Sequence, residues 1–556
     1  MLHAPAEKYR PFVPMAFPQR TWPDRRLVAA PRWCSTDLRD GNQALAVPMD
    51  LARKRRLFDL LVAIGFREIE VAFPAASQVE YDFVRGLIDQ QKIPPEVTIQ
   101  VMTQAREALI ARTFEALHGV PRAIVHVYNA TAPLFRRVVF GQGRAETVAL
   151  AVEATRQVRE QCERAPQTAW TYQYSPETFC FTEPDFALEI CEAVIAAWQP
   201  TAERPLILNL PTTVEVAMPN VFADQIEWFC QALSSRQHVT ISIHPHNDRG
   251  TAVATAEQAL LAGAERVEGC LFGNGERTGN VDLLTLALNL YTQGIAPGLD
   301  FSDIDEVRAV LEWCNGLPVH PRHPYAGELV YTAFSGSHQD AIRKGFAARQ
   351  AQNGPEWEIP YLPLDPADVG RSYEAVIRVN SQSGKGGAAW IVEQELGIRL
   401  PYRLQVDFGQ QMQQAADASG HELGRDELVA LFLRCYGRSD DPQGWALGEY
   451  GLERRTEQCR FAGELRQGLA AHAAQGVGNG PLSALVAALA VVGVDITIDD
   501  YSEHALGSGA MAQAVAFVEG HGSDGQARFG MGIDADTGHA SLLAVMALVN
   551  GCVTTA

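Results

Sequence analysis

The sequence predicts an α/β protein built on a TIM (β/α)8 barrel, followed by a helical linker subdomain and a C-terminal α+β domain. Three observations support this prediction. Eight short apolar runs alternate with longer helical patterns between about residues 30 and 290, the rhythm breaks after about residue 300, and two similar glycine-rich segments end the chain. Alternating strands and helices are typical of a parallel sheet, and eight such units in this length match a closed barrel.

The eight runs are the expected barrel strands, because each is short and rich in β-branched or aromatic residues. They are RWCSTDL (32–38), REIEVAF (67–73), VTIQVMT (97–103), AIVHVYN (123–129), TAWTYQYS (168–175), PLILNLP (205–211), HVTISIHPH (238–246) and RVEGCLFG (266–273). The stretches between them carry the helical period, as at Leu57, Leu60, Leu61 and Ile64. An open doubly wound sheet is the alternative, but it would need a nucleotide-binding fingerprint where the chain has RDGNQAL.

The middle of the chain is predicted to be helical. Proline-rich segments at 317–325 and 359–370 frame a helical piece over 329–350, and a second helical pattern covers 428–435. The polar, glycine-containing segment 407–427 is expected to be a hinge.

The last hundred residues contain a weak internal repeat. GVGNGPLSALVAALAVV (476–492) and GMGIDADTGHASLLAVMALV (530–549) each place a glycine-rich turn before a helix start. This pattern predicts two β-rich units, each closed by a helix, in a ligand-binding regulatory module. One stretch, CRFAGELRQGLAAHAA (459–474), fits two strands poorly.

The composition limits the classes of partner. With Lys plus Arg 46 against Asp plus Glu 66, the 556 residues carry a net charge of −20, which argues against nucleic acid or an anionic membrane as a partner. Anionic ligands must therefore be bound locally, by arginine, glycine-rich backbone or a metal. Ten cysteines without a C-x-x-C pair, and an N-terminus without the apolar core of a signal peptide, predict reduced thiols and a cytoplasmic location.

A metal site is expected at the end of the seventh strand, in HPHND. Alternate residues of a strand share a face, so His244 and His246 can present two imidazoles to one point at the carboxyl end of the barrel, where TIM-barrel active sites lie. Asp40, after the first strand, is the expected third ligand, although it could instead cap a helix. Asn280, after the eighth strand, could add an amide oxygen. One carboxylate and two imidazoles suit a divalent cation with open positions, such as Zn²⁺, Mn²⁺ or Mg²⁺.

Arg39 stands beside Asp40 in the sequence. An arginine near a metal-bound carbonyl can stabilise a developing oxyanion, and the alternative role is an ion pair at the barrel mouth. The loop GNGERTGN (273–280) permits close backbone approach and lies where barrels of this kind often bind phosphate.

Six motifs connect these features to a known family: STDLRDGNQAL, GFREIEVAFPAASQ, HPHNDRGTAVA, LFGNGERTGN, YTAFSGSHQDA and YEAVIRVNSQSGKGG. Together they cover nearly the whole chain, and they resemble the 2-isopropylmalate synthase family in its long bacterial form with a C-terminal leucine-regulatory domain. The wider group includes citramalate and homocitrate synthases and the hydroxymethylglutaryl-CoA lyases. The lyases carry a catalytic Cys in the eighth-strand loop, and GNGERTGN has none, which favours a synthase.

The resemblance implies an acyltransferase that condenses acetyl-CoA with 2-oxoisovalerate and water to give 2-isopropylmalate and CoA, the first committed step of leucine synthesis. It implies that Asp40, His244, His246 and Asn280 bind the divalent metal and that Arg39 stabilises the alkoxide. By motif match, the catalytic candidates are Arg39, Glu177, His338 and Tyr373, and the substrate-binding candidates are Arg39, His126, Ser175 and Thr213. Glu177 or His338 could be the general base, and His338 and Tyr373 could come from the partner subunit. Glu177 could equally cap a helix, His338 pack within one and Tyr373 lie in the core.

The expected organisation is a catalytic barrel with an N-terminal extension over 1–310, linker subdomains over 311–439 and a leucine-binding regulatory domain over 440–556. The resemblance implies a homodimer inhibited by leucine at an interface of the last domain. Two rival functions remain at this point. One is citramalate or homocitrate synthesis, and the other is a catalytically inactive barrel that serves as a leucine sensor.

Overall fold

The structure is a computed structural model of the chain, and it describes residues 12–333, 335–352, 356–372, 384–419, 423–437, 444–455, 457–507 and 512–553, with Lys8 and Gly509. The chain divides into two compact units. The first comprises Met1–Val330 with Leu364–Arg371, and the second comprises Tyr331–Pro363 with Ser372–Ala556. The boundaries expected at residues 310 and 439 remain predictions, because the division gives two units rather than three.

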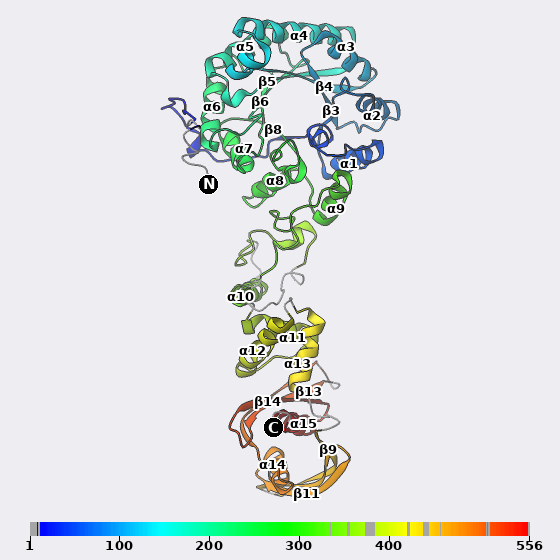
Figure 1. Ribbon diagram of the computed structural model, residues 1–556, viewed down its shortest axis with the longest axis vertical. Coiled ribbons are helices and arrows are strands. Elements are labelled where there is room, and N and C mark those ends of the chain that lie inside the picture. Colours follow the sequence, from blue (N-terminus) through cyan, green and yellow to red (C-terminus); the bar gives the residue numbers. More distant parts are fainter. Residues whose placement is uncertain are drawn as a thin grey trace. The chain divides into compact units, whose positions relative to one another are not determined.

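The first unit is the expected barrel. All eight predicted strands form, and they close in chain order, with β1 paired in parallel to both β2 and β8 (Figure 1). The strands are β1 (Arg32–Ser35), β2 (Glu68–Ala72), β3 (Thr98–Gln104), β4 (Arg122–Ala130), β5 (Ala169–Glu177), β6 (Leu206–Pro211), β7 (Val239–His244) and β8 (Arg266–Gly269). The α/β class and the TIM barrel are thereby confirmed.

Helices surround this barrel (Figure 1). They are α1 (Leu51–Ile64), α2 (Gln78–Asp89), α3 (Glu107–Ala116), α4 (Arg144–Arg164), α5 (Pro184–Trp198), α6 (Pro219–Ala232), α7 (Ala252–Leu261), α8 (Leu283–Tyr291) and α9 (Ile304–Asn315). None of the helices in the described part of the chain has the length and apolar character that a bilayer crossing requires.

Helix α1 shows how the sequence sets the ends of these helices. Asp50 caps its N-terminus by accepting a hydrogen bond from the backbone N–H of Arg53, and Gly65 follows its last residue at φ +110°. This left-handed conformation would strain any residue with a Cβ, so glycine ends the helix at low cost. Leu57 and Leu61, one turn apart, are fully buried, as the helical period predicts.

The second unit begins with helices: α10 (Gly336–Gln352), α11 (Gly384–Leu396), α12 (Tyr402–Ser419) and α13 (Arg425–Tyr436). The hinge expected over 407–427 is wrong, since most of that segment lies in α12. Leu404, Phe408, Met412 and Ala416 recur every fourth residue and are buried, so one narrow apolar stripe holds an otherwise polar helix in place.

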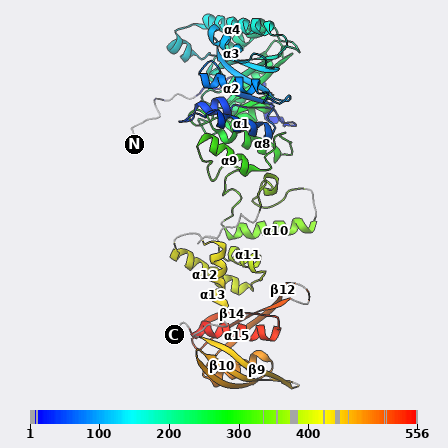
Figure 2. The same ribbon diagram turned by 90° about the vertical axis from the view of Figure 1, so that its right-hand side faces the viewer.

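Two three-stranded antiparallel sheets follow, in the orders β11-β10-β9 and β12-β13-β14, and each is closed by a helix. Their elements are β9 (Trp445–Arg455), β10 (Gln458–Gln467), β11 (Ala470–Gly478), α14 (Pro481–Val491), β12 (Thr497–Leu506), β13 (Gln513–His521), β14 (Ala527–Asp534) and α15 (Thr537–Val553). Figure 2 shows α15 lying along β14, and the two helices share one apolar core. The internal repeat in the sequence therefore corresponds to two similar structural units.

The stretch 459–474 forms two strands after all, so the expectation that it fits poorly is wrong. Cys459 pairs with Gly478 and Gln467 with Ala470 along a continuous antiparallel hairpin. Small residues hide the pattern because α14 packs closely on β11. A Cβ at Gly476 would lie 2.2 Å from the backbone oxygen of Ala484, so this face of the strand cannot carry the large apolar side chains that mark an ordinary strand.

Candidate metal and substrate site

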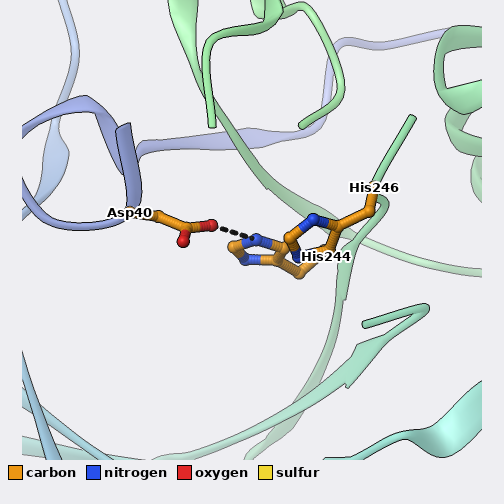
Figure 3. A group of neighbouring side chains, drawn as sticks. All are labelled: Asp40, His244 and His246. Atoms are coloured by element: carbon orange, nitrogen blue, oxygen red, sulfur yellow. Dashed lines mark hydrogen bonds and ion pairs between the residues drawn. The ribbon is translucent and has the colours of Figure 1, made fainter. Parts of the chain in front are cut away.

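The metal ligands expected from the sequence meet at the carboxyl ends of the barrel strands. Asp40 lies in a short π-helical segment, Asp37–Gly41, directly after β1, and His244 is the last residue of β7. His246 follows two residues later and forms an isolated bridge with Asn280 from the loop after β8. Figure 3 shows the carboxylate of Asp40 and the two imidazoles facing one another.

The distances within this group are short enough for one cation. Ligand atoms of Asp40, His244 and His246 all lie within 4.8 Å of one another. Asp40 Oδ2 is 3.1 Å from His244 Nε2, and the two imidazole rings are 5.1 Å apart. All three residues are buried, so the site is shielded from solvent and its electrostatic interactions are strong.

The charges of the site are set by its neighbours. Burial alone would raise the pKa of Asp40, but Arg39 and His244 hold it well below its usual range. Burial opposes protonation of His244, yet Asp40 and Glu268 raise its pKa to about 9. His246 is different, because burial and the neighbouring His244 lower its pKa to about 3. His246 is therefore a neutral imidazole with a lone pair to donate.

Asn280 lies beside this group and is the fourth ligand expected from the sequence. Its Nδ2 donates a hydrogen bond to Asp40 Oδ2 at 2.7 Å, while its Oδ1 is buried without a hydrogen-bond partner among the described residues. A buried amide oxygen is costly to leave unpaired, and an oxygen in this place suits a hard cation. The loop is held by Gly279 at φ +102°, where a Cβ would lie 1.9 Å from the backbone oxygen of Gly273. These residues fit a divalent cation.

Arg39 forms the ion pairs that its position at the barrel mouth allows, with Asp40 and Glu70. Its Nη1 lies 3.1 Å from Asp40 Oδ1, and its Nε donates to Glu70 Oε1 at 2.5 Å. Despite burial, which opposes the charged form, Glu70 and Asp40 raise the pKa of Arg39 above its usual value. The structure thus holds a permanent positive charge beside the expected metal ligands.

Two of the expected substrate residues meet inside the barrel mouth. His126 on β4 and Ser175 on β5 are buried, with Nε2 and Oγ 2.7 Å apart, and Ser175 also accepts a hydrogen bond from Asn209 Nδ2 at 3.0 Å. Thr213 follows β6 at φ +60°, and no hydrogen bond among the described residues joins it to His126 or Ser175. Its hydroxyl oxygen accepts a hydrogen bond from the Thr178 backbone N–H at 2.8 Å.

Glu177 ends β5 and is half-buried. Its alternative role as a helix cap is excluded, because Thr178 occupies the N-cap position of the next helical turn, Phe179–Phe181, and Glu183 occupies that of α5. Among the described residues its carboxylate has neither a hydrogen bond nor an ion pair. Burial raises its pKa, although the charge of Arg39 opposes this shift. A carboxylate without a fixed partner at the barrel mouth is available to exchange a proton with a ligand.

The remaining two candidates, His338 and Tyr373, follow the barrel in the sequence. His338 is exposed on α10 in the second unit, where its ring stacks on Tyr361 with 4.0 Å between ring centroids. Tyr373 lies outside the described residues. The structure therefore does not test either as a catalytic group.

The sequence reasoning missed a buried polar network beneath the expected metal ligands. It consists of Glu70, Gln100, Asn209, Arg266 and Glu268, all inside the barrel and at most 1% exposed. The sequences of the strands contain a signal for this network. REIEVAF and RVEG place charged residues inside otherwise apolar runs, and alternate residues of a barrel strand point to the interior.

Comparison with known proteins connects this site to a family. The HMGL-like family model matches residues 30–311, the model of the alpha-isopropylmalate synthase post-catalytic domain matches 328–393, and the LeuA allosteric (dimerisation) domain matches 423–553. The chain is 58% identical to a 2-isopropylmalate synthase of Ralstonia nicotianae over 99% of its own length and 95% of the relative's. It is 55% identical to that of Marinomonas sp. over 99% of both chains, and 56% identical to that of Azotobacter vinelandii over 99% of this chain and 98% of the relative. The resemblance inferred from the sequence motifs is confirmed, and the chain belongs to the 2-isopropylmalate synthase family.

Proposed function

We propose that this chain catalyses the condensation of acetyl-CoA with 2-oxoisovalerate (3-methyl-2-oxobutanoate) and water to give 2-isopropylmalate and CoA. A carbon–carbon bond forms between the acetyl methyl group and the ketone carbon, and water cleaves the thioester. The observation that supports this proposal most is the sequence identity to 2-isopropylmalate synthases over nearly the full chain. The buried set of candidate metal ligands, which suits an oxo acid, agrees with it. Neither rival function, citramalate or homocitrate synthesis or an inactive sensor, is favoured by those relatives.

Asp40, His244, His246 and the free Oδ1 of Asn280 would hold Mg²⁺, Mn²⁺ or Zn²⁺. When bound, the cation supplies a Lewis acid that polarises the ketone of the oxo acid. Arg39 stabilises the negative charge that develops on the ketone oxygen, because its guanidinium is fixed by Glu70 and needs no reorganisation. The local positive charge also explains how a chain of net charge −20 can bind an anionic substrate.

His126, Ser175 and Thr213 would orient the oxo acid. The hydroxyl of Thr213 already accepts a hydrogen bond, so its own proton remains to be donated to a substrate carboxylate. Glu177 is the best-supported general base, because its carboxylate has no partner among the described residues and burial raises its pKa. His338 and Tyr373 remain proposed catalytic residues on the motif match alone.

The second unit would regulate the enzyme. The match of residues 423–553 to an allosteric dimerisation domain supports a homodimer with an allosteric site, and we propose leucine as the inhibitor that binds there. The location that we propose is the cytoplasm, because the ten cysteines are spread along the sequence without a C-x-x-C pair, as expected of reduced thiols.

Release of free thiol from acetyl-CoA tests the proposal. Metal-replete protein is assayed with 2-oxoisovalerate, pyruvate and 2-oxoglutarate in parallel. We expect the highest kcat/KM with 2-oxoisovalerate. A clear preference for pyruvate or 2-oxoglutarate would contradict the substrate, and no thiol release with any of the three would favour the inactive sensor.

A further inference from the structure

Glu268 on β8 lies at the centre of the barrel, directly beneath the metal ligands, and its side chain is completely buried. We propose that Glu268 is a positioning residue: it fixes the ring and the tautomer of His244 so that Nε2 faces the metal. This inference rests on the proposed metal site and names the residue that organises it.

Glu268 contacts His244 directly. Oε2 of Glu268 is 2.9 Å from Nδ1 of His244, and Nε2 of the same ring points to Asp40 at 3.1 Å. A carboxylate can only accept a hydrogen bond, so Nδ1 must carry the proton. When a cation takes the place of a proton on Nε2, the neutral ring then has the one tautomer that can act as a ligand. Outer partners of this kind fix metal-bound histidines in general.

Residues from five strands hold the carboxylate of Glu268 in place. Its Oε1 accepts hydrogen bonds from Gln100 on β3, Gln173 on β5 and Arg266 on β8, each at 2.8 Å, and its Oε2 also accepts one from Asn209 on β6 at 3.0 Å. With His244 on β7, both oxygens are fully engaged and the carboxylate cannot rotate. Although burial would raise the pKa of Glu268, Arg266 and His244 hold it well below its usual range.

The same network reaches the substrate residues. Nδ2 of Asn209 donates to both Glu268 Oε2 and Ser175 Oγ, at 3.0 Å each, and Ser175 is bonded to His126. Glu268 is therefore connected to a metal ligand on one side and, through one amide, to the substrate pair on the other.

The informative variant is Glu268→Gln. Three donors face the position of Oε1, so the amide oxygen of glutamine will occupy it and the NH2 group will replace Oε2. That NH2 donates to Nδ1 of His244, which moves the ring proton to Nε2 and blocks the lone pair that the metal needs. Asn209 can accommodate the change by turning its amide, because its Oδ1 has no partner among the described residues.

Glu68→Gln is the matched control. Glu68 also pairs with Arg266, at 2.5 Å, but it lies at the other end of the strands and does not contact His244. Both variants replace one buried carboxylate beside Arg266, and only Glu268→Gln changes the partner of His244. The thermal midpoint compares their effects on folding.

The test measures the Kd for Mn²⁺ of the full chain after metal removal, together with the thermal midpoint. We expect Glu268→Gln to weaken Mn²⁺ binding roughly 10- to 100-fold, and Glu68→Gln to leave it near the wild-type value at a similar midpoint. A wild-type Kd in folded Glu268→Gln, or equal weakening in both variants, overturns the inference. If Glu268→Gln does not fold, Glu268→Asp retains the charge but withdraws the carboxylate by one methylene, and it must weaken Mn²⁺ binding for the inference to stand.

Turnover with 2-oxoisovalerate separates this inference from the proposed function. If the wild type binds Mn²⁺, loses affinity in Glu268→Gln and yet never releases CoA, the positioning role stands and the proposed reaction fails. If the wild type turns over and folded Glu268→Gln binds Mn²⁺ as tightly, the reaction stands and the positioning role fails.

Discussion

Asn280 donates its amide to Asp40 across the barrel mouth, with 2.7 Å between Nδ2 and Oδ2, and leaves its own Oδ1 buried and unpaired among the described residues. The bond joins the loop after β8 to the segment after β1. It also fixes the direction of the free oxygen. Asn280 thus presents its Oδ1 in a fixed orientation, so its contribution to metal binding can be tested by substitution.

Substitution of Asn280 by alanine should weaken metal binding without unfolding the barrel. The variant loses the free oxygen and one hydrogen bond to Asp40, but it retains the carboxylate and both imidazoles. We expect the Kd for Mn²⁺ to rise at least as much as on loss of an outer partner, roughly 10- to 100-fold. Titration of metal-free protein measures it, and an unchanged Kd would show that Oδ1 is not a ligand.

His246→Ala should abolish turnover with the fold intact. His246 is a neutral imidazole in the proposed ligand set. Among the described residues its side chain contacts the ring of His244 and lies 3.4 Å from Nη2 of Arg277. Little of the fold therefore depends on it. Thiol release and the thermal midpoint should be measured together, and near-normal activity would mean that the ligands are misplaced.

Glu177→Gln should lower kcat by about 10²- to 10⁴-fold, the usual contribution of a general base. The pH dependence follows from the raised pKa of Glu177. The base must be ionised to act, so the kcat/KM of the wild type should fall as the pH drops through a pKa above the usual glutamate value. The variant should lack this acid limb.

The control for that prediction is His338→Ala. If Glu177→Gln retains wild-type kcat while His338→Ala loses it, the base has been assigned to the wrong residue.

Leucine inhibition should depend on the close contact between β11 and α14. A Cβ at Gly478 would lie 2.3 Å from Ser483 Oγ and 2.6 Å from its backbone carbon, so Gly478→Ala must displace the start of α14. We expect this variant to lose leucine inhibition and retain basal turnover. Gly451→Ala on β9 is the matched control, because nothing lies within 4 Å of its added Cβ. Retained inhibition in Gly478→Ala would locate the effector elsewhere.

The barrel was predictable because burial on both faces makes its strands continuous apolar runs, each visible in the sequence. The meeting of Asp40, His244 and His246 followed from the rule that barrel sites lie at the carboxyl ends of strands. Glu268 was not predicted, since a lone glutamate in RVEG does not reveal which five strands supply its partners. Likewise the stripe Leu404–Phe408–Met412 is too narrow to distinguish a helix from a polar hinge, and the small residues of β11 hide a strand that only the packed helix explains.

The most direct test of the account is turnover of acetyl-CoA with 2-oxoisovalerate by metal-free protein as Mn²⁺ is added back. We predict no release of CoA without metal, and saturable recovery that reaches its plateau at one ion per chain and yields 2-isopropylmalate. Undiminished turnover after metal removal, or an inert protein at saturating Mn²⁺, would contradict the metal-centred condensation.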